Sequence, residues 1–476
     1  MADTDLKTPT RVHGVLFFAF LIGALGTPAP LADAATGAAG PWRLSQAAAL
    51  PDGLAISGTQ RTRYETLDGQ FRAGREGGDQ MLALRTTLRV EVSRDAFGLV
   101  GELADSRQKL ADTGTPIATS MVNTLELLQA YAVARFDGPL VEGSRSEVRL
   151  GRQTVDVGSR RLMARNRFRN TINAFTGVHW QWQLPEGPTA RAFYVLPVIR
   201  QPSDAESLLD NDVELDDEGF DLQLWALHVQ WPGLPGSATG EVYVFALHED
   251  DSGDRATRNR RLYTPGLRVS RAPAKGAWYF DIESVAQVGK TRGSTDPADT
   301  TDLDHLAYFQ HVEVGYTFDR SWSPTVAVLY DYASGDDRPD DDDSNRFDTL
   351  FGARRFEYGP TGIYGAFARS NIQSPGYRLS ARPTSRVDAM LAHRLYWLAS
   401  DADGWTTSGL RDPSGDAGSF VGHQLEARLR WDILPGNLGL EMGGAHLFAG
   451  GFIDDVPNAT GRGDTTYGYL ALNVRF

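Results

Sequence analysis

The feature that most constrains this chain is an alternation of apolar and polar side chains with a period of two residues. In residues 81–92 the apolar face comprises Leu82, Leu84, Leu88, Val90 and Val92. The opposite face carries Arg85 and Arg89. Successive side chains of a strand point to opposite sides, so this pattern indicates a β-strand with one apolar face. Residues 421–433 repeat it, with Arg428 and Arg430 on the polar face.

About eighteen segments carry this pattern, each of the length that crosses a bilayer as a tilted strand. They are residues 56–65, 81–92, 97–106, 125–136, 146–153, 177–184, 189–199, 221–231, 240–249, 262–271, 278–289, 307–318, 324–334, 377–382, 386–398, 421–433, 437–448 and 466–476. A soluble β-sandwich or propeller also has many strands, but it does not need so many of ten or more residues.

The connections between these segments alternate loosely between tight turns and long, often acidic loops. A membrane barrel requires this, because its two rims face different compartments. The pattern therefore predicts an all-β fold: a single transmembrane antiparallel β-barrel of about 18 strands over residues 56–476. Its short turns are expected to be periplasmic and its long loops extracellular.

The N-terminus predicts export. A polar start with Lys7 and Arg11 precedes an apolar run at residues 15–26, and Ala32-Asp33-Ala34 fits a small-residue cleavage site. We interpret residues 1–34 as a cleaved signal peptide, with a membrane anchor or buried helix as the alternative. Residues 35–55 are then an N-terminal periplasmic segment. The predicted location is the Gram-negative outer membrane.

The C-terminus supports barrel closure. Phe476 is in phase with Leu470, Leu472 and Val474 on the apolar face of the last segment, which resembles the C-terminal signature of Gram-negative outer-membrane proteins. Closing the sheet there removes both of its edges, which is obligatory in lipid. Aromatic pairs at strand ends are expected to form interfacial girdles or, alternatively, to pack in the core. These pairs are Trp180 with Trp182, Trp225 with Trp231, Tyr396 with Trp397, and Tyr467 with Tyr469.

Residues 151–170 concentrate positive charge in a chain whose net charge is −14. The six arginines of this segment are Arg152, Arg160, Arg161, Arg165, Arg167 and Arg169. A nucleic-acid patch would need a basic domain with exposed stacking aromatics, which an acidic exported chain does not offer. Two alternatives stay open. The segment is either a solvated charged face or part of a basic pore lining that lowers the cost of bringing in an anion.

The polar faces of the predicted strands supply the candidate pore-lining, substrate-binding residues, which are Arg85, Arg89, Arg149, Arg152, Arg428 and Arg430. Arg152 is in phase with Val148 and Leu150, which would point it at lipid. A bulge at Gly151 would turn it inward, or it lies at the rim. The arginines at positions 160–169 lack strand periodicity and are expected in a loop that folds into the pore.

Several motifs resemble the alginate export family of outer-membrane porins. They are LGRQTVDVGSRRLMARNRFRN at 150–170, FTGVHW at 175–180, YDYASGD at 330–336, FDTLFGARRFEYGPTG at 347–362 and GHQLEARLRW at 422–431. This resemblance implies an 18-stranded monomeric barrel whose arginine-rich pore passes a polyanionic uronate polysaccharide outward. It also implies basic pore-lining roles for Arg85, Arg89, Arg152, Arg428 and Arg430. Lysine is almost absent here, and many family members carry other substrates, so the resemblance specifies the fold more firmly than the cargo.

Three other functions stay open: a substrate-selective uptake porin for small organic anions or sugars, an outer-membrane enzyme, and a plugged structural or adhesive barrel. The histidines are scattered and show no HExxH or GxSxG context, so we expect no enzyme. The chain has no cysteine, which rules out disulfides and thiolate metal sites. The acidic residues 335–345 suit calcium chemically but lack the spacing of a calcium loop, so we expect no metal and no cofactor.

The expected partners follow from the predicted barrel. They are an anionic polysaccharide or small anionic solute, outer-membrane lipid and lipopolysaccharide, and periplasmic export proteins. We expect a monomer that does not bind nucleic acid.

Overall fold

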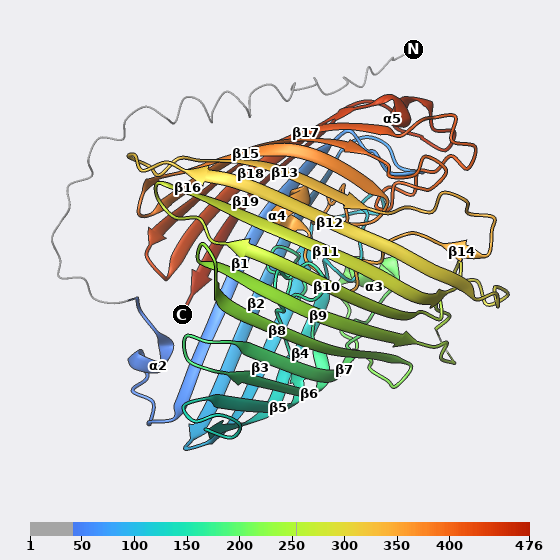
Figure 1. Ribbon diagram of the computed structural model, residues 1–476. Helices are drawn as coiled ribbons and strands as arrows, with labels where there is room; N and C mark the ends of the chain where they lie inside the picture. The colour runs from blue at the N-terminus through green and yellow to red at the C-terminus, as the bar shows by residue number, and fades with distance from the viewer. Residues whose placement is uncertain (1–40, 254) are drawn as a thin grey trace, which may run out of the picture. The chain divides into compact units, whose positions relative to one another are not determined.

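Eighteen strands close into one antiparallel barrel in this computed structural model, which describes residues 41–253 and 255–476 (Figure 1). The predicted signal peptide lies outside the described residues. The strands are β1 (Leu54–Asp68), β2 (Asp79–Arg94), β3 (Phe97–Lys109), β4 (Asn123–Asp137), β5 (Arg145–Gln153), β6 (Phe175–Gln183), β7 (Thr189–Pro197), β8 (Leu222–Leu234), β9 (Ala238–Glu249), β10 (Arg261–Arg271), β11 (Ala277–Thr291), β12 (Leu303–Thr317), β13 (Thr325–Ala333), β15 (Ile372–Thr384), β16 (Val387–Trp397), β17 (Phe420–Leu434), β18 (Leu438–Ala449) and β19 (Thr465–Arg475).

The remaining elements are short. A two-residue strand, β14 (Asp343–Ser344), pairs with β12 outside the regular order of the barrel. The helices are α2 (Leu44–Ala47), α3 (Ala205–Asp210), α4 (Arg355–Tyr358) and α5 (Gly451–Asp455). Within the described residues, no helix is long and apolar enough to cross a bilayer.

The barrel closes where its first and last strands pair. The register of β1 against β19 runs from Thr59 opposite Arg475 to Asp68 opposite Thr466. The main chain of Phe476 extends this ladder, with reciprocal hydrogen bonds to Gly58 of 3.0 and 2.9 Å. Its ring covers Gly58, where an added Cβ would come within 2.4 Å of it. The predicted closure at the C-terminal strand is confirmed, and the sheet has no free edge.

All eighteen segments predicted from alternation correspond to barrel strands. The largest differences in bounds are at β12, which begins four residues before the predicted 307, and at β15, which extends beyond the predicted 377–382 at both ends. At the start of β15, Ser374, Pro375 and Gly376 interrupt the apolar alternation. The sequence pattern therefore does not show that these residues belong to the strand, although they pair with β13. β1 begins at Leu54, two residues before the predicted start of the barrel.

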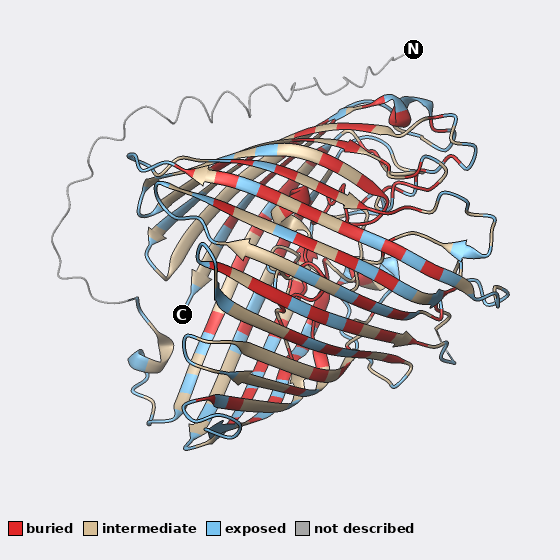
Figure 2. Cartoon of the chain, viewed as in Figure 1, coloured by how far each residue is buried: buried red, intermediate tan, exposed pale blue. Residues whose placement is uncertain are grey.

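The two faces of each strand have opposite environments. Apolar side chains such as Leu99, Leu150 and Val328 are more than 60% exposed on the outer surface, where a membrane barrel meets lipid. Charged and aromatic side chains on the alternate positions are buried, and Figure 2 shows this as bands along the strands. The lumen is therefore filled by polar side chains of the strands and by loop segments that fold into it.

The girdle prediction is wrong for three tyrosines. Tyr396, Tyr467 and Tyr469 are almost completely buried and face the lumen. The hydroxyl of Tyr467 donates to the Glu65 carboxylate at 2.9 Å, and that of Tyr469 donates to the Glu441 carboxylate at 2.7 Å. On β19 the outward positions are those of Leu470 and Leu472, so the tyrosines belong to the other face.

The long connections lie at one rim, and the short connections share the other rim with the first residue of β1 and the C-terminus. Two long connections turn into the lumen. We name residues 154–174, between β5 and β6, the basic loop, and residues 334–371, between β13 and β15, the long loop. Helix α4 belongs to the long loop and lies within the ring of strands (Figure 1).

Candidate functional site: a basic cavity and its constriction

The basic loop and the long loop pair with each other inside the lumen. Met163 forms an isolated parallel bridge with Phe351. The Phe351 N–H donates to the Leu162 carbonyl at 2.9 Å, and the Ala353 N–H donates to the Arg160 carbonyl at the same distance. These main-chain bonds join two segments that are far apart in sequence. Together the loops form a constriction across the barrel.

Close backbone approach between the two loops depends on one glycine. A Cβ added at Gly352 would lie 1.7 Å from the Arg161 carbonyl oxygen. No side chain fits at that distance, because the obstructing atom belongs to the main chain. Glycine at this position therefore permits the pairing of the two loops.

Arg161 anchors the basic loop to the barrel wall and to the long loop. Its guanidinium donates to Glu357 of α4 at 2.5 Å, to Glu283 of β11 at 2.5 Å and to Asp281 of β11 at 3.1 Å. The Arg161 side chain is only 3% exposed. A guanidinium with several carboxylate partners is a strong, directional contact, which explains how a loop without regular structure holds one position.

The other arginines of the basic loop divide between anchoring and lining. Arg165 pairs with Glu102 of β3 at 2.7 Å. Arg160 lies over the ring of Phe356, 5.1 Å from its centre. Arg167 is mostly exposed to the lumen, with Asp156 at 3.3 Å. Arg169 has no carboxylate partner among the described residues.

Main-chain carbonyls of the basic loop are held by arginines from the first two strands. Arg61 of β1 donates to the carbonyls of Arg167 at 2.8 Å and of Arg169 at 2.9 Å. Arg85 of β2 donates to the carbonyl of Arg169 at 3.0 Å. These bonds orient the guanidinium groups without neutralising them, because a carbonyl carries no net charge.

The constriction borders a large cavity that extends to the rim with the short turns. Its volume is about 1600 Å³, and it is lined by eighteen arginines and one lysine against six carboxylates. The whole chain, in contrast, has a net charge of −14. The positive charge of the protein is therefore concentrated on the inner surface of the barrel, where low-dielectric walls strengthen its field.

Eight of these lining arginines lack a carboxylate within 4.0 Å among the described residues: Arg43, Arg61, Arg85, Arg160, Arg169, Arg354, Arg386 and Arg475. The pKa of Arg354 is lowered to about 9 by burial and then by the charges of Arg169, Arg72 and Arg369. The pKa of Arg169 is lowered to about 10 by burial and by Arg200. Both groups remain charged at neutral pH, and both would be stabilised by an anion.

Acidic side chains on strands β9, β11 and β13 are already neutralised by arginines of the barrel wall. Arg268 of β10 pairs with Glu241 at 2.5 Å and with Asp281 at 2.6 Å. Arg394 of β16 pairs with Asp331 at 2.6 Å. These carboxylates therefore neutralise arginines of the strands beside them. They do not compensate the positive charge of the arginines at the constriction.

Comparison with known proteins identifies the family of this barrel. The family model described as alginate export matches residues 53–464, which is most of the chain. The chain belongs to the alginate export family. No curated protein matches its sequence. Together with the closed barrel, the family assignment makes this alginate export family protein a channel of the Gram-negative outer membrane.

Solved porins share the fold of this alginate export family member at low sequence identity. Pseudomonas aeruginosa OpdO is 15% identical, with a TM-score of 0.54 over 90% of this chain and 98% of the other. P. aeruginosa OccK8 (OprE) is 12% identical, with a TM-score of 0.57 over 89% and 98%. Acinetobacter baumannii OccAB3 is 11% identical, with a TM-score of 0.56 over 89% and 99%. At these identities the likeness concerns the fold alone.

Four of the six arginines predicted to line the pore of this family member do line the cavity: Arg85, Arg89, Arg428 and Arg430. Three of them have acidic neighbours. Arg89 pairs with Glu91 at 3.0 Å, Arg430 pairs with Glu441 at 2.7 Å, and Arg428 lies 3.6 Å from Asp388. Their role in substrate binding stays a prediction.

The other two predicted arginines lie outside the cavity lining. Arg149 faces inward but pairs with Glu147 on its own strand at 2.6 Å and lies 5.5 Å from the ring centre of Tyr131. Arg152 faces outward and does not line the pore. It is opposite the exposed Ala130 in a register that is continuous through residue 151, so no bulge turns it inward.

Arg152 is held at the long-loop rim by the connection between β7 and β8. Its guanidinium pairs with Glu218 at 2.9 Å and lies 3.9 Å from Asp216. This placement agrees with strand parity and with the rim alternative. It corrects the pore-lining role that the family resemblance implied for this residue.

The arginines at positions 160–169 lie, as the sequence predicts, in a loop that folds into the pore, but sequence reasoning missed the other arginines at the constriction. Arg61 and Arg63 of β1 were detectable, because they share one face of the predicted strand at residues 56–65. Arg354 and Arg355 were not detectable from the sequence, because the motif that contains them lacks strand periodicity. Arg355 donates to Glu426 of β17 at 2.6 Å, so it also anchors the long loop.

Among the described residues, one buried group has the composition of a metal site: His311, Asp331 and Glu357. Asp331 accepts hydrogen bonds from His311 at 2.7 Å and from Arg394 at 2.6 Å. Glu357 is held by Arg161. These partners occupy the carboxylate oxygens, and the three guanidiniums of Arg161, Arg369 and Arg394 beside the group disfavour a cation. The acidic residues 335–345 form no such group within the described part of the chain.

Proposed function

We propose that this outer-membrane channel passes an acidic polysaccharide of the alginate type outward through its arginine-lined lumen. The supporting observation is the cavity lining, with nineteen basic side chains against six carboxylates. Rings of arginine or lysine select for anions, because they lower the electrostatic cost of bringing negative charge into a pore. A uronate chain carries one carboxylate per sugar and thus matches a lining with many separate positive groups.

The arginines without carboxylate partners give this lumen its capacity to bind. A substrate that approaches Arg85 or Arg169 has no internal ion pair to displace. Guanidinium groups bind carboxylates through two parallel hydrogen bonds, which adds orientation to charge. Several weak contacts of this kind along the lumen favour entry of a polyanion without trapping it, which is a requirement for conduction.

A second candidate is selective uptake of small organic anions or sugars. It is favoured by the constriction, because two loops that are bonded together across the lumen suit a small solute better than a polymer. The same arginines serve both functions. In either case we propose a monomer that carries out no reaction, and in the first case one that works with periplasmic export proteins.

The test is a planar-bilayer measurement on the refolded protein under a salt gradient. The reversal potential should show anion selectivity, and an oligouronate added to the short-turn side should block the current. The double variant Arg85→Gln and Arg169→Gln should reduce both effects. Arg152→Gln is the matched control, because this arginine lies outside the pore and should leave both unchanged.

The outcomes separate the candidates. Block that strengthens with oligouronate length supports a polymer pathway. Block by a monocarboxylate as strong as block by the oligouronate favours small-anion uptake. Cation selectivity, or the absence of a conducting channel, would contradict both proposals.

A further inference from the structure

A second cavity lies on the outer surface of the barrel, at the rim with the long loops. Its volume is about 500 Å³, within the range of small-ligand sites, which is roughly 300–1,000 Å³. The lining residues are Asp337, Gln373, Pro375, Trp397, Leu398, Ala399, Ser400, Asp401 and Ser419, and we name this cavity the rim cleft. None of them lines the pore cavity, so the rim cleft is a separate feature.

Strand parity places the rim cleft outside the lumen. Gln373 of β15 is opposite Tyr332, whose ring stacks with outward-facing Tyr308 at a centroid distance of 5.3 Å. The next residue, Ser374, faces the lumen, where it accepts a hydrogen bond from Arg394 at 3.0 Å. Trp397 is the last residue of β16. The rim cleft therefore opens toward the outer leaflet and the surface glycans beyond it.

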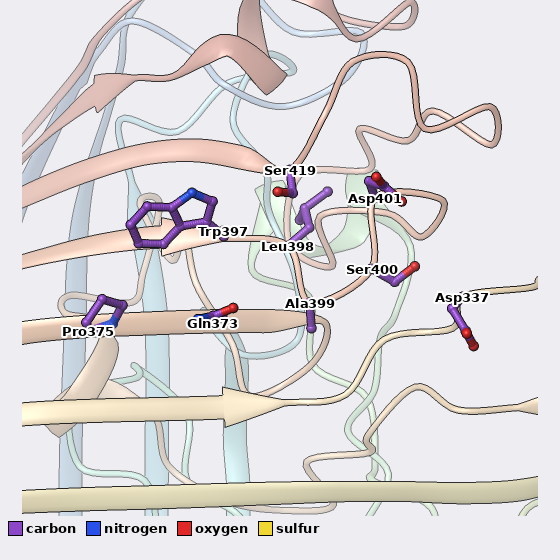
Figure 3. Close-up of a pocket in the computed structure, with 9 residues that line it drawn as sticks. All are labelled: Asp337, Gln373, Pro375, Trp397, Leu398, Ala399, Ser400, Asp401 and Ser419. Atoms are coloured by element: carbon purple, nitrogen blue, oxygen red, sulfur yellow. The ribbon is translucent and has the colours of Figure 1, made fainter.

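The rim cleft combines an apolar wall with polar groups that have no other role. Trp397, Pro375 and the buried Leu398 form the wall, and Phe420 lies 5.1 Å from the indole, which helps to fix its position. Figure 3 shows Trp397, Pro375 and Gln373 on the strand side, with Asp337 and Asp401 on the loops. An aromatic face beside hydrogen-bonding groups suits a ligand with one apolar and several polar sides.

The polar side chains of the rim cleft are uncommitted. Among the described residues, Gln373, Asp337, Asp401 and Ser419 make no side-chain hydrogen bond, and neither does the indole N–H of Trp397. Together they offer two acceptor-only carboxylates, an amide, a hydroxyl and a donor. Neighbouring hydroxyl groups that both donate and accept would satisfy this set.

Charge excludes the main alternatives. The lining contains two carboxylates and no arginine or lysine, so an anionic sugar or a phosphate would be repelled. The two carboxylates belong to no group of three metal-type ligands within the described residues. A purely apolar occupant, such as an acyl chain, would leave the polar groups desolvated without partners.

We propose that the rim cleft binds an uncharged saccharide, with a pyranose ring stacked on Trp397 and its hydroxyls bonded to Gln373, Asp337 and Asp401. The source is either a neutral sugar of the surface glycolipid or a free oligosaccharide. The site lies apart from the anionic pathway, and the proposal does not depend on the cargo of the pore.

The test is saturation-transfer NMR on the refolded full-length protein in a zwitterionic detergent, because glucoside and maltoside detergents carry competing sugars. The probes are maltotriose, a deacylated, dephosphorylated and carboxyl-reduced core oligosaccharide of lipopolysaccharide, and an oligouronate. Transfer to at least one neutral probe and none to the oligouronate at the rim cleft is expected. Transfer to the core oligosaccharide alone would identify the glycolipid as the source.

Two variants assign the signal to the rim cleft. Trp397→Ala should weaken binding of the neutral probe at least tenfold, whereas Trp278→Ala, which removes a 63% exposed tryptophan from β11, should not. The double variant Asp337→Asn and Asp401→Asn should admit the oligouronate. The proposal is overturned if neither neutral probe binds the folded barrel, or if Trp397→Ala leaves binding intact. The single-channel conductance of Trp397→Ala should be unchanged. A loss of saccharide binding in this variant would then concern the rim cleft alone and would be independent of any failure of the pore proposal.

Discussion

Arg161 and Glu357 lie 2.5 Å apart in the lumen although 196 residues separate them in the sequence. Their ion pair joins the basic loop to the long loop. Glu357 also accepts a hydrogen bond from Arg369, and Arg161 also reaches Glu283, so the pair lies at the centre of a network. The constriction therefore depends on a few buried charges rather than on an apolar contact alone.

Replacement of Glu357 by glutamine should loosen the constriction and leave the barrel folded. Removal of one partner of a buried ion pair typically costs about 3–5 kcal/mol, because the other charge is left without compensation. The closed ladder of eighteen strands does not depend on this contact. We expect larger, noisier single-channel currents and retention of heat-modifiable migration on gels.

Glu218→Gln is the matched control for this variant. Glu218 pairs with Arg152 at 2.9 Å, but it does so at the outer rim and away from the lumen. It should leave the current unchanged. An unaltered current in Glu357→Gln would show that the two loops are held by other contacts.

Arginines without carboxylate partners should contribute more to anion selectivity than arginines with them. Arg430 pairs with Glu441 at 2.7 Å, and Arg428 lies 3.6 Å from Asp388. Arg85 and Arg169 have no such neighbour among the described residues. The pair Arg85→Gln and Arg169→Gln should therefore shift the reversal potential toward zero further than the pair Arg428→Gln and Arg430→Gln.

The comparison includes its own control, since each pair removes two positive charges from the same cavity. Equal shifts would mean that total charge, and not local compensation, determines selectivity. Glutamate in place of Arg428 and Arg430 should weaken anion preference further, because it adds negative charge to the cavity. If the reversal potential stays unchanged in all of these variants, the pore-lining role of these arginines is contradicted.

The barrel was predictable because lipid imposes one rule on every strand. Each strand must present an apolar face outward. The alternation around Leu88 and Leu429 can therefore be recognised in each strand by itself, without knowing which strands lie beside it. The same parity placed Arg85 and Arg428 inside. It also placed Arg152 outside, and the structure agrees with parity there rather than with the family resemblance.

The constriction was not predictable in the same way. Arg161 and Glu357 lie in segments without periodicity, and their meeting depends on where two loops fold within the lumen. Arg149 has the inward parity that the sequence predicts, yet its partner Glu147 and its place outside the cavity follow from packing. Strand patterns report a side of the sheet, but they do not report which inward residues remain accessible.

Substitution of alanine for Gly352 should disturb the pairing of the two loops. The added Cβ would lie 1.7 Å from the Arg161 carbonyl oxygen, so the backbone of one loop has to move. We expect an altered conductance and faster proteolysis within residues 334–371. Gly101→Ala is the control, because an added Cβ there meets nothing within 4 Å. Normal conductance in Gly352→Ala would show that the loops adjust without losing the constriction.

Block by an oligouronate should weaken strongly as salt concentration rises. The Debye length falls from about 10 Å at 0.1 M to about 3 Å at 1 M, which screens the attraction between the arginine lining and a polyanion. The cavity of about 1600 Å³ is large enough for ions to enter and screen its walls. We expect the blocking constant to rise at least tenfold over this range.

An uncharged oligosaccharide of the same length is the control for this salt series, since its block depends on size and should change little. A steep salt dependence for the oligouronate alone would indicate that the guanidinium groups attract it. Equal and weak dependence for both sugars would indicate that the constriction acts by size, and the basic lining would then need another explanation. Because Arg61, Arg85, Arg169 and Arg354 have no carboxylate partners among the described residues, we expect the first result.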